Sequence, residues 1–322
     1  MRKRLSPALA LLCALTALLA GCGGGSDESS RPAPSAAEFP AAKGKTIAEL
    51  LHDSGAKPTK LVIAPAAQVF DLGANRYPFG VFTRGNEQVS DADVALYFAR
   101  DAEGPVIGPL PAQVSSLETK PAYRAQTSEG DATTAYVVQK VDFDRPGPWL
   151  AIAMLKGEGG LEASRVPSPV VGGSPAVPNV GEKAPVVHTP TAAEVGGDLA
   201  KIDTRVPPDQ MHEVDFADVV GKQPTVLVFA TPALCQSRVC GPVVDVAQQV
   251  ADEYKGKADF IHMEVYNDND PGKGIRPQLR AYGLPTEPWT FLVDRNGVVR
   301  DRIEGAYGVL ELEQAMRTIV PG

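Results

Sequence analysis

Short apolar runs, separated by turn residues, fill the chain between residues 59 and 165. The run Ala135–Phe143 partly alternates between apolar and polar positions, as a half-buried antiparallel strand does. Pro146–Pro148 forms a turn, after which Trp149 enters a last strand. We therefore expect an all-β domain here. The predicted strands are Lys60–Ala64, Gln68–Asp71, Phe79–Thr83, Val94–Arg100, Tyr123–Gln126, Thr134–Asp144 and Trp149–Lys156.

The last third of the chain alternates between strand and helix patterns. Thr225–Phe229 is a continuous apolar run, typical of a strand buried on both faces, and Val243–Tyr254 has apolar residues at helical spacing. Asn296-Gly297 predicts a two-residue hairpin turn. The resulting order is strand, helix, strand, helix, strand, strand, helix. The other predicted elements are the strands Phe260–Val265, Thr290–Val293 and Val298–Ile303, and the helices Ile275–Tyr282 and Val309–Ile319.

A segment rich in proline and glycine, residues 166–199, separates these two patterns. It shows no apolar periodicity, so it is predicted to be a semi-rigid linker that spaces two domains apart. Seven short strands in about 100 residues suit an immunoglobulin-like sandwich, expected over residues 59–165. An α/β domain is expected over residues 200–322.

The N-terminus has the pattern of an export signal. A positive segment, Arg2–Arg4, precedes the apolar run Ala8–Ala20, which is shorter than the roughly 20 residues that a membrane-spanning helix needs. Leu19–Cys22 resembles the lipobox of bacterial lipoproteins, which implies a signal peptide over residues 1–21 and acyl chains on Cys22. These features predict a protein anchored by lipid to the extracytoplasmic face of the cell membrane.

Residues 22–58 follow as a predicted flexible tether, because their first part is rich in glycine, serine and proline. Within this stretch, Thr46–Asp53 is predicted to form one short helix. The formal net charge of the chain is −8, and removal of the signal would make it more acidic. This charge excludes nucleic acid as a partner and argues against attachment to anionic lipid by charge alone.

The four cysteines of the chain have different predicted fates. Cys13 leaves with the signal and Cys22 carries lipid, so Cys235 and Cys240 are the remaining pair. Two thiols five residues apart in an oxidising compartment are predicted to form a disulfide. The sequence leaves open whether that disulfide is structural or catalytic.

The α/β region resembles the thioredoxin superfamily, and within it the membrane-tethered, extracytoplasmic TlpA-type branch. The resemblance rests on VLVFATPALCQSRVCGP, at the first strand and the helix start, and on LPTEPWTFLVD, before a central strand. It implies that Pro288 is the counterpart of the family's cis-proline, whose sharp turn leaves the preceding backbone beside the redox cysteine. An ordinary trans proline at a strand start is the alternative.

The cysteine spacing departs from the C-x-x-C of that family. Residues five apart lie about 140° apart on an ideal helix, so Cys235 must lie in a loop or the first turn must be irregular. Counted from the strand, Cys235 holds the nucleophile's position; counted from the Cys-Gly-Pro tripeptide, Cys240 does. A helix N-terminus and Arg238 would favour the thiolate form of either cysteine.

A second departure concerns proton transfer. Many thioredoxins have an acidic residue six positions before the first cysteine, whereas this chain has Phe229. Glu264 and Glu287 are the candidate substitutes. With Cys235, Cys240 and Pro288 as catalytic residues, the function predicted is thiol–disulfide exchange with exported proteins or a membrane electron donor, without cofactor or metal.

Two other functions stay open at this stage. The chain could be a non-catalytic surface binding or assembly module with a structural disulfide. It could also resemble the Sco-type copper chaperones, which share this fold and use a cysteine pair with a distant histidine. The candidates for that histidine and its neighbours are His188, His212, His262 and Met263.

Overall fold

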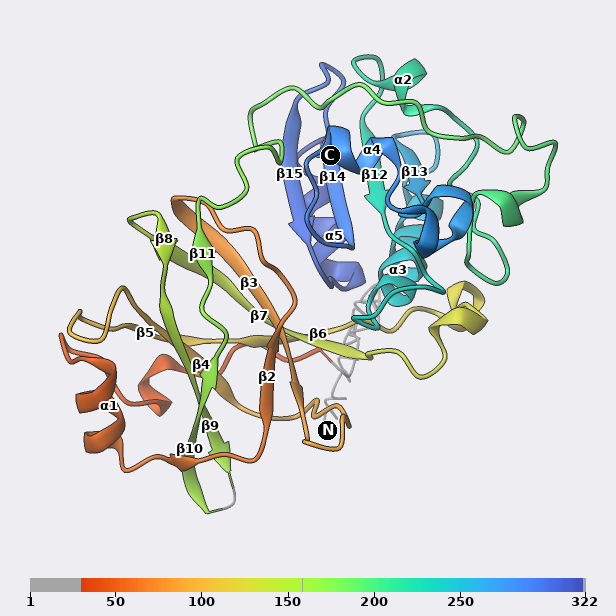
Figure 1. Ribbon diagram of the computed structural model, residues 1–322. Coiled ribbons are helices and arrows are strands. Elements are labelled where there is room, and N and C mark those ends of the chain that lie inside the picture. The colour runs from red at the N-terminus through yellow and green to blue at the C-terminus, as the bar shows by residue number, and fades with distance from the viewer. Residues whose placement is uncertain (1–29, 158, 321–322) are drawn as a thin grey trace, which may run out of the picture.

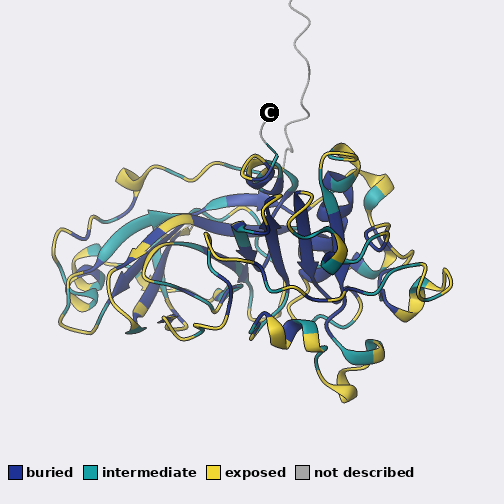
Figure 2. Cartoon of the chain, turned by 90° about the horizontal axis from the view of Figure 1, so that it is seen from above, coloured by how far each residue is buried: buried dark blue, intermediate teal, exposed yellow. Residues whose placement is uncertain are grey.

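The computed structural model describes residues 30–157 and 159–320, which form two halves that lie against each other (Figure 1). The predicted signal peptide over residues 1–21, with Cys13, and the predicted lipid site at Cys22 lie outside the described residues. Among the residues described, no helix is long and apolar enough to cross a membrane. Figure 2 shows buried strands at the centre of each half and exposed loops around them.

The N-terminal half consists of two β-sheets that share one core. One sheet has the strand order β2-β3-β7-β6 and the other the order β1-β10-β9-β4-β5. Side chains from both sheets meet in an aromatic cluster that includes Tyr77, Phe98, Phe143 and Trp149. The all-β sandwich is therefore confirmed at the level of two packed sheets. The strands are β1 (Lys57–Pro58), β2 (Val62–Pro65), β3 (Gly73–Phe82), β4 (Val94–Ala99), β5 (Ile107–Pro111), β6 (Gln113–Ser116), β7 (Thr134–Phe143), β9 (Leu150–Gly157) and β10 (Gly160–Val166).

Some strands differ from those predicted. Residues 68–71 make only one isolated bridge, at Phe70, and residues 121–128 form two short 3₁₀ turns in place of the predicted strand Tyr123–Gln126. The sequence pattern did not predict β5, β6 and β10. Pro109 and Pro111 lie inside β5, and because prolines in a short run are typical of turns, the sequence pattern did not indicate a strand here.

The flexible tether predicted over residues 22–58 is wrong for residues 30–58. These residues carry the helix α1 (Ile47–Ser54), whose start is capped reciprocally by Thr46 and Glu49. Phe39 and Leu50 are buried against the five-stranded sheet. Their apolar contacts order a segment whose composition alone suggested a linker.

The C-terminal half is a four-stranded sheet covered by helices on both faces. The strand order is β13-β12-β14-β15, with β12 parallel to β13 and antiparallel to β14. Val226 and Val228 of β12 face α3 and α5, while Leu227 and Phe229 face α2 and α4. This order is the expected thioredoxin-like arrangement. The elements are α2 (Phe216–Val219), β12 (Thr225–Phe229), α3 (Cys240–Glu253), β13 (Asp259–Met263), α4 (Pro277–Ala281), β14 (Trp289–Val293), β15 (Val299–Glu304) and α5 (Val309–Met316).

The segment 166–199 does not hold the halves apart, which corrects the predicted spacer. Its short strand β11 (Val170–Val171) pairs with β8 (Gly147–Pro148), and Val171 is buried in the sandwich core. Further along, Val177 and Val187 are buried in the core of the C-terminal half. Apolar residues between the prolines thus attach the segment to both halves.

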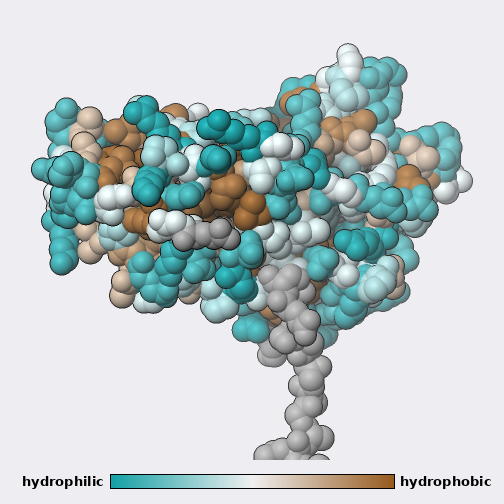
Figure 3. Space-filling view, turned by 90° about the horizontal axis from the view of Figure 1, so that it is seen from below, coloured by the Kyte–Doolittle hydropathy of each residue, from teal (hydrophilic) through white to brown (hydrophobic). Residues whose placement is uncertain are grey.

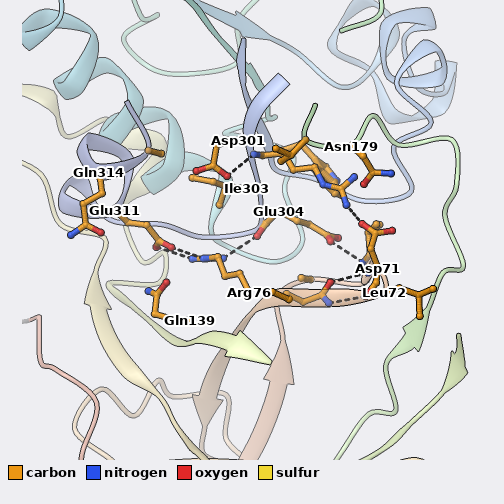
Figure 4. Close-up of a pocket in the computed structure, with 18 of the residues that line it drawn as sticks. Asp71, Leu72, Arg76, Gln139, Asn179, Asp301, Ile303, Glu304, Glu311 and Gln314 are labelled. Atoms are coloured by element: carbon orange, nitrogen blue, oxygen red, sulfur yellow. Dashed lines mark hydrogen bonds and ion pairs between the residues drawn. The ribbon is translucent and has the colours of Figure 1, made fainter. Parts of the chain in front are cut away.

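Polar contacts join the two halves around a cavity of about 890 Å³ (Figure 4). Arg76 of β3 forms an ion pair with Glu311 of α5, and its guanidinium also donates to the carbonyl of Glu304. The Glu304 carboxylate accepts hydrogen bonds from the backbone N–H groups of Gln68 and Val69. The sandwich is thus docked on the end of the sheet where β15 finishes and β14 begins.

Candidate redox site and its surroundings

Cys235 and Cys240 form the predicted disulfide, with their Cα atoms 6.0 Å apart. Residues 230–239, called the redox loop here, connect β12 to α3, and Cys240 is the first residue of that helix. Arg238 has a φ of 58°, a left-handed conformation that turns the loop back toward the helix. The sequence required either that Cys235 lies in a loop or that the first helical turn is irregular. The structure shows the first of these, because Cys235 lies in the redox loop and α3 begins regularly at Cys240.

The two sulfur-bearing residues differ in exposure. Cys240 is fully buried, whereas Cys235 is partly exposed and its Sγ lies 3.1 Å from the hydroxyl of Ser237. Of the two cysteines, only Cys235 has any solvent-exposed surface. Cys240 lies at the positive end of α3, which would stabilise it as a leaving thiolate.

Pro288 lies at the same end of the sheet as the redox loop. The Glu287–Pro288 peptide bond is cis, as the resemblance implied. Trp289, the next residue, pairs with Phe229, the last residue before the loop. Pro288 is buried, and its carbonyl accepts a hydrogen bond from the N–H of Gly305. The pairing of β12 with β14 thus brings the cis-proline and the redox loop to the same end of the sheet.

The two predicted proton acceptors occupy different positions. Glu264 is buried, and its carboxylate accepts hydrogen bonds from the N–H and the hydroxyl of Thr204. The same hydroxyl accepts from the N–H of Ala233 in the redox loop, so a hydrogen-bonded path joins Glu264 to the loop. Glu287 precedes the cis-proline, and burial raises the pKa of its carboxyl group.

Residues 117–133 of the sandwich, called the sandwich loop here, cover the start of α3 (Figure 1). The backbone N–H of Ala132 donates to the carbonyl of Arg238 at 3.0 Å, and the Arg238 guanidinium donates to the carbonyl of Gly130. A side chain at Gly241 would meet Asp131 Oδ2 at 2.7 Å. A small apolar cluster completes this contact; its members are Leu117, Ala132, Ala135, Val239 and Ala306.

A buried ion pair anchors the sandwich loop further along α3. Arg205 Nε donates to Asp245 Oδ1 at 2.9 Å, and both side chains are almost completely buried. The other carboxylate oxygen accepts from the N–H of Ala125 and the hydroxyl of Ser128. Burial raises the pKa of Asp245. No local pattern predicts this contact, because an aspartate among the apolar residues of a helix is typical of its solvent-facing side.

Asp131 brings a carboxylate to the site that sequence reasoning missed. It lies against Gly241, next to Cys240, and burial raises its pKa. It stands in the turn of a loop more than 100 residues before the cysteines, so no local pattern could identify it.

Among the described residues, the histidines considered as copper ligands do not form a group of potential metal ligands with the cysteines. His188 is exposed and contacts Asp215, which raises the pKa of His188 through a hydrogen bond. Met263 is buried in the core on one face of the sheet. His212 and His262 lie together with two aspartates, and within the described residues no cysteine belongs to that group of potential ligands.

No family model and no curated protein matches this chain. A protein provisionally described as the thiol:disulfide interchange protein DsbE of Chlorobium tepidum is 21% identical, with a TM-score of 0.31. That match covers 43% of this chain and 96% of the other. A DsbF homologue from Corynebacterium diphtheriae is 18% identical with a TM-score of 0.30, covering 44% of this chain and 90% of the other.

A third structure, a ZirS C-terminal domain, is 12% identical over 52% of this chain and 96% of its own, with a TM-score of 0.18. The strand order and pairing of the C-terminal half, rather than these likenesses, assign it to the thioredoxin-like fold.

Proposed function

We propose that this protein is a lipid-anchored, extracytoplasmic thiol–disulfide oxidoreductase of the TlpA type. The observation that carries the proposal is the disulfide itself, in which Cys235 is partly exposed and Cys240 is the buried first residue of α3. Its partners would be exported proteins with thiols or disulfides, or an electron donor in the membrane. Cys235 is the nucleophile and Cys240 the resolving cysteine.

The exchange runs through a mixed disulfide. A substrate thiolate attacks Cys235 Sγ, which forms a substrate–Cys235 disulfide and releases Cys240 as the thiolate. A second substrate thiolate then attacks the substrate sulfur and releases the Cys235 thiolate. The substrate loses two electrons and two protons, which the pair keeps as two thiols; the reverse sequence reduces a substrate disulfide.

Pro288 is assigned a substrate-positioning role. A peptide that reaches Cys235 would lie along the backbone before the cis-proline, at the sheet edge that the redox loop shares. Glu264, linked to the loop through Thr204, is assigned the proton transfer that Phe229 cannot perform.

The location of the protein is part of the proposal. Leu19–Cys22 at the end of an apolar run supports acylation of Cys22 and retention at the extracytoplasmic face of the cell membrane. Cells fed radiolabelled palmitate should incorporate it into the wild-type protein and not into Cys22→Ala. Unlabelled wild type, or label that persists in Cys22→Ala, would contradict the anchor.

We further infer that the sandwich has immunoglobulin-like connectivity. The orders β2-β3-β7-β6 and β10-β9-β4-β5 support this inference, because they follow the A-B-E-D and G-F-C pattern of that fold, with β5 as an additional edge strand. Figure 3 shows apolar surface gathered over the sandwich half of one face. That surface supports a role for the sandwich in contacting the protein partner.

The central experiment traps the mixed disulfide. Reduced Cys240→Ser protein, mixed with glutathione disulfide, should retain a glutathione adduct on Cys235 that mass spectrometry detects. The matched variant Cys235→Ser should form little adduct, because its remaining thiol is buried. Preferential labelling of Cys240 would reverse the assigned roles.

A structural disulfide is the second candidate, and the cover that the sandwich loop provides over α3 favours it. In that case the protein would act only as a binding module. A reduction potential below about −300 mV, together with no exchange in either variant, would identify the pair as structural.

A further inference from the structure

Four buried side chains converge on one another in the C-terminal half: Asp203, Asp209, His212 and His262, called the His–Asp cluster here. Each is at most 2% exposed. Three of them come from the segment that precedes α2, and His262 comes from β13. One potential ligand atom from each side chain lies within 4.8 Å of all the others. Sequence pattern did not predict these four residues as one metal site, because they are separated by up to 59 positions.

Backbone hydrogen bonds hold the cluster in place. The N–H of His262 donates to the carbonyl of Met211, which lays the segment along the free edge of β13. The Asp203 carboxylate accepts from the N–H groups of Arg205 and Asp209, and the Asp209 carboxylate accepts from the N–H of Met211. The four side chains are therefore positioned before any ligand binds.

The separations suit a small cation. His212 Nε2 lies 3.4 Å from an oxygen of Asp203 and 3.4 Å from an oxygen of Asp209. His262 Nδ1 lies 2.7 Å from Asp209 and 3.8 Å from Asp203. Zinc–ligand bonds of about 2.0–2.2 Å in a tetrahedron place neighbouring ligand atoms roughly 3.4 Å apart. Small adjustments would let all four atoms face one ion.

The remaining hydrogen bonds fit the same role. His262 Nε2 lies 3.2 Å from the carbonyl of Ala230, and a histidine that binds a metal typically donates its other ring N–H to such a group. In this structure Nδ1 forms a hydrogen bond with the Asp209 carboxylate at 2.7 Å, so a cation bound at Nδ1 would take the place of the proton in that bond. His212 Nε2 is buried without any hydrogen-bond partner, although it points at two carboxylates.

The two aspartate carboxylates of the His–Asp cluster also favour binding of a cation. Among the described residues, no lysine or arginine forms an ion pair with Asp203 or Asp209. Their ion-pair partners among the described residues are the two imidazoles, and because buried carboxylates are costly, a divalent ion would compensate both more fully. Aspartate oxygens with imidazole nitrogens are a donor set that suits zinc.

We propose that the His–Asp cluster binds one zinc ion as a site separate from the cysteine pair. The ion would join the segment that carries Asp203 to β13. Through His262 and Ala230 it would also support the start of the redox loop. The site does not depend on the proposed redox function, since no sulfur belongs to it.

The test uses the oxidised protein, in which the disulfide removes both cysteines as ligands. After chelator treatment, titration with Zn²⁺ should give one ion per chain and raise the unfolding temperature. His212→Ala and His262→Ala should lose this binding, whereas His188→Ala, at an exposed histidine, should retain it. The double variant Cys235→Ser/Cys240→Ser should also retain it.

Cobalt provides a readout that does not depend on how well a variant folds. Co²⁺ added to the stripped wild-type protein should give the visible absorption of a tetrahedral ion without a thiolate-to-cobalt band. No binding by wild type, binding that survives His212→Ala, or a thiolate band would each overturn the proposal. Loss of zinc binding with intact exchange, or the converse, would separate this site from the redox site.

Discussion

The two halves of the molecule bury different kinds of polar group. In the sandwich, the buried polar side chains of the described residues are all hydroxyls: Ser115, Ser116, Ser128 and Thr134. The C-terminal half buries ionisable groups; among them are Asp203, Arg205, Asp209, His212, Asp245, His262, Glu264, Asp294 and Glu304.

This contrast separates scaffold from chemistry. Buried charge is costly, so a domain keeps it where partners compensate it or where function requires it. The sandwich is stabilised by apolar area and by aromatic contacts such as Phe98 with Phe143. Its loop nevertheless reaches the other half, where Ser128 donates to Asp245. The sandwich thus covers the start of α3 with its loop, while the buried ionisable groups lie in the C-terminal half.

The strongest test of this division is removal of the exposed sulfur. Cys235→Ser should abolish thiol–disulfide exchange, because the remaining thiol is buried. Phe143→Leu, in the sandwich core, should lower the free energy of unfolding and leave the exchange rate unchanged. Stopped-flow assays of exchange and urea denaturation measure the two effects. A Phe143→Leu variant with impaired exchange would show that the halves are not separable in function.

The next largest effect is expected at the buried ion pair. Arg205→Met removes the ion-pair partner of the buried Asp245 carboxylate, which should cost about 3–5 kcal/mol of stability in urea denaturation. Arg295→Met, at an exposed arginine, should change stability by less than about 0.5 kcal/mol. The double variant Arg205→Met/Asp245→Leu should recover much of the loss. Equal stability of Arg205→Met and wild type would mean that this pair does not anchor the sandwich loop.

A milder change should displace the cover itself. Gly241→Ala introduces a Cβ at 2.7 Å from Asp131 Oδ2 and 2.8 Å from Ser128 Oγ, so these two side chains of the sandwich loop must shift, and the Ser128 hydrogen bond to Asp245 with them. We expect a loss of about 1–3 kcal/mol and faster reduction of the disulfide by dithiothreitol. Gly159→Ala, where a Cβ meets no atom within 4 Å, is the matched control. An unchanged reduction rate in Gly241→Ala would argue that the loop does not limit access.

The smallest effect is expected in the pH dependence of stability. Burial raises the pKa of Glu304 above its ordinary 4.5, against the hydrogen bonds from Thr286 and the N–H groups of Val69 and Gln68. The folded state therefore holds this proton more tightly than the unfolded state. The contribution is fully present below pH 4.5 and is lost as the pH rises through the raised folded-state pKa. The urea midpoints of wild type and Glu304→Gln should converge at the acid end of this range, where the Glu304 side chain is protonated and neutral like that of glutamine. Midpoints that differ by the same amount at every pH would contradict the raised pKa.

Local pattern predicted the elements well where each one is strongly periodic or continuous. Thr225–Phe229 is observed as β12 with the predicted bounds, and the Asn296-Gly297 turn joins β14 to β15. Prediction failed where contacts with the rest of the molecule decide the conformation. Residues 30–58 are ordered because Phe39 and Leu50 pack against the five-stranded sheet. The prolines of β5 are typical of turns, but pairing with β4 stabilises this segment as a strand.

The sequence by itself determined that this protein has a β-rich half and an α/β half, and that Cys235 and Cys240 cannot bridge from a regular helix. These features depend on residues close together in the chain. Only the tertiary structure decided which cysteine is buried, that the Glu287–Pro288 bond is cis, that Asp131 and Ser128 cover the helix start, and that Asp209 contacts His262. Such contacts join residues dozens to more than a hundred positions apart, so they follow from the path of the whole chain and leave no periodic trace in the sequence.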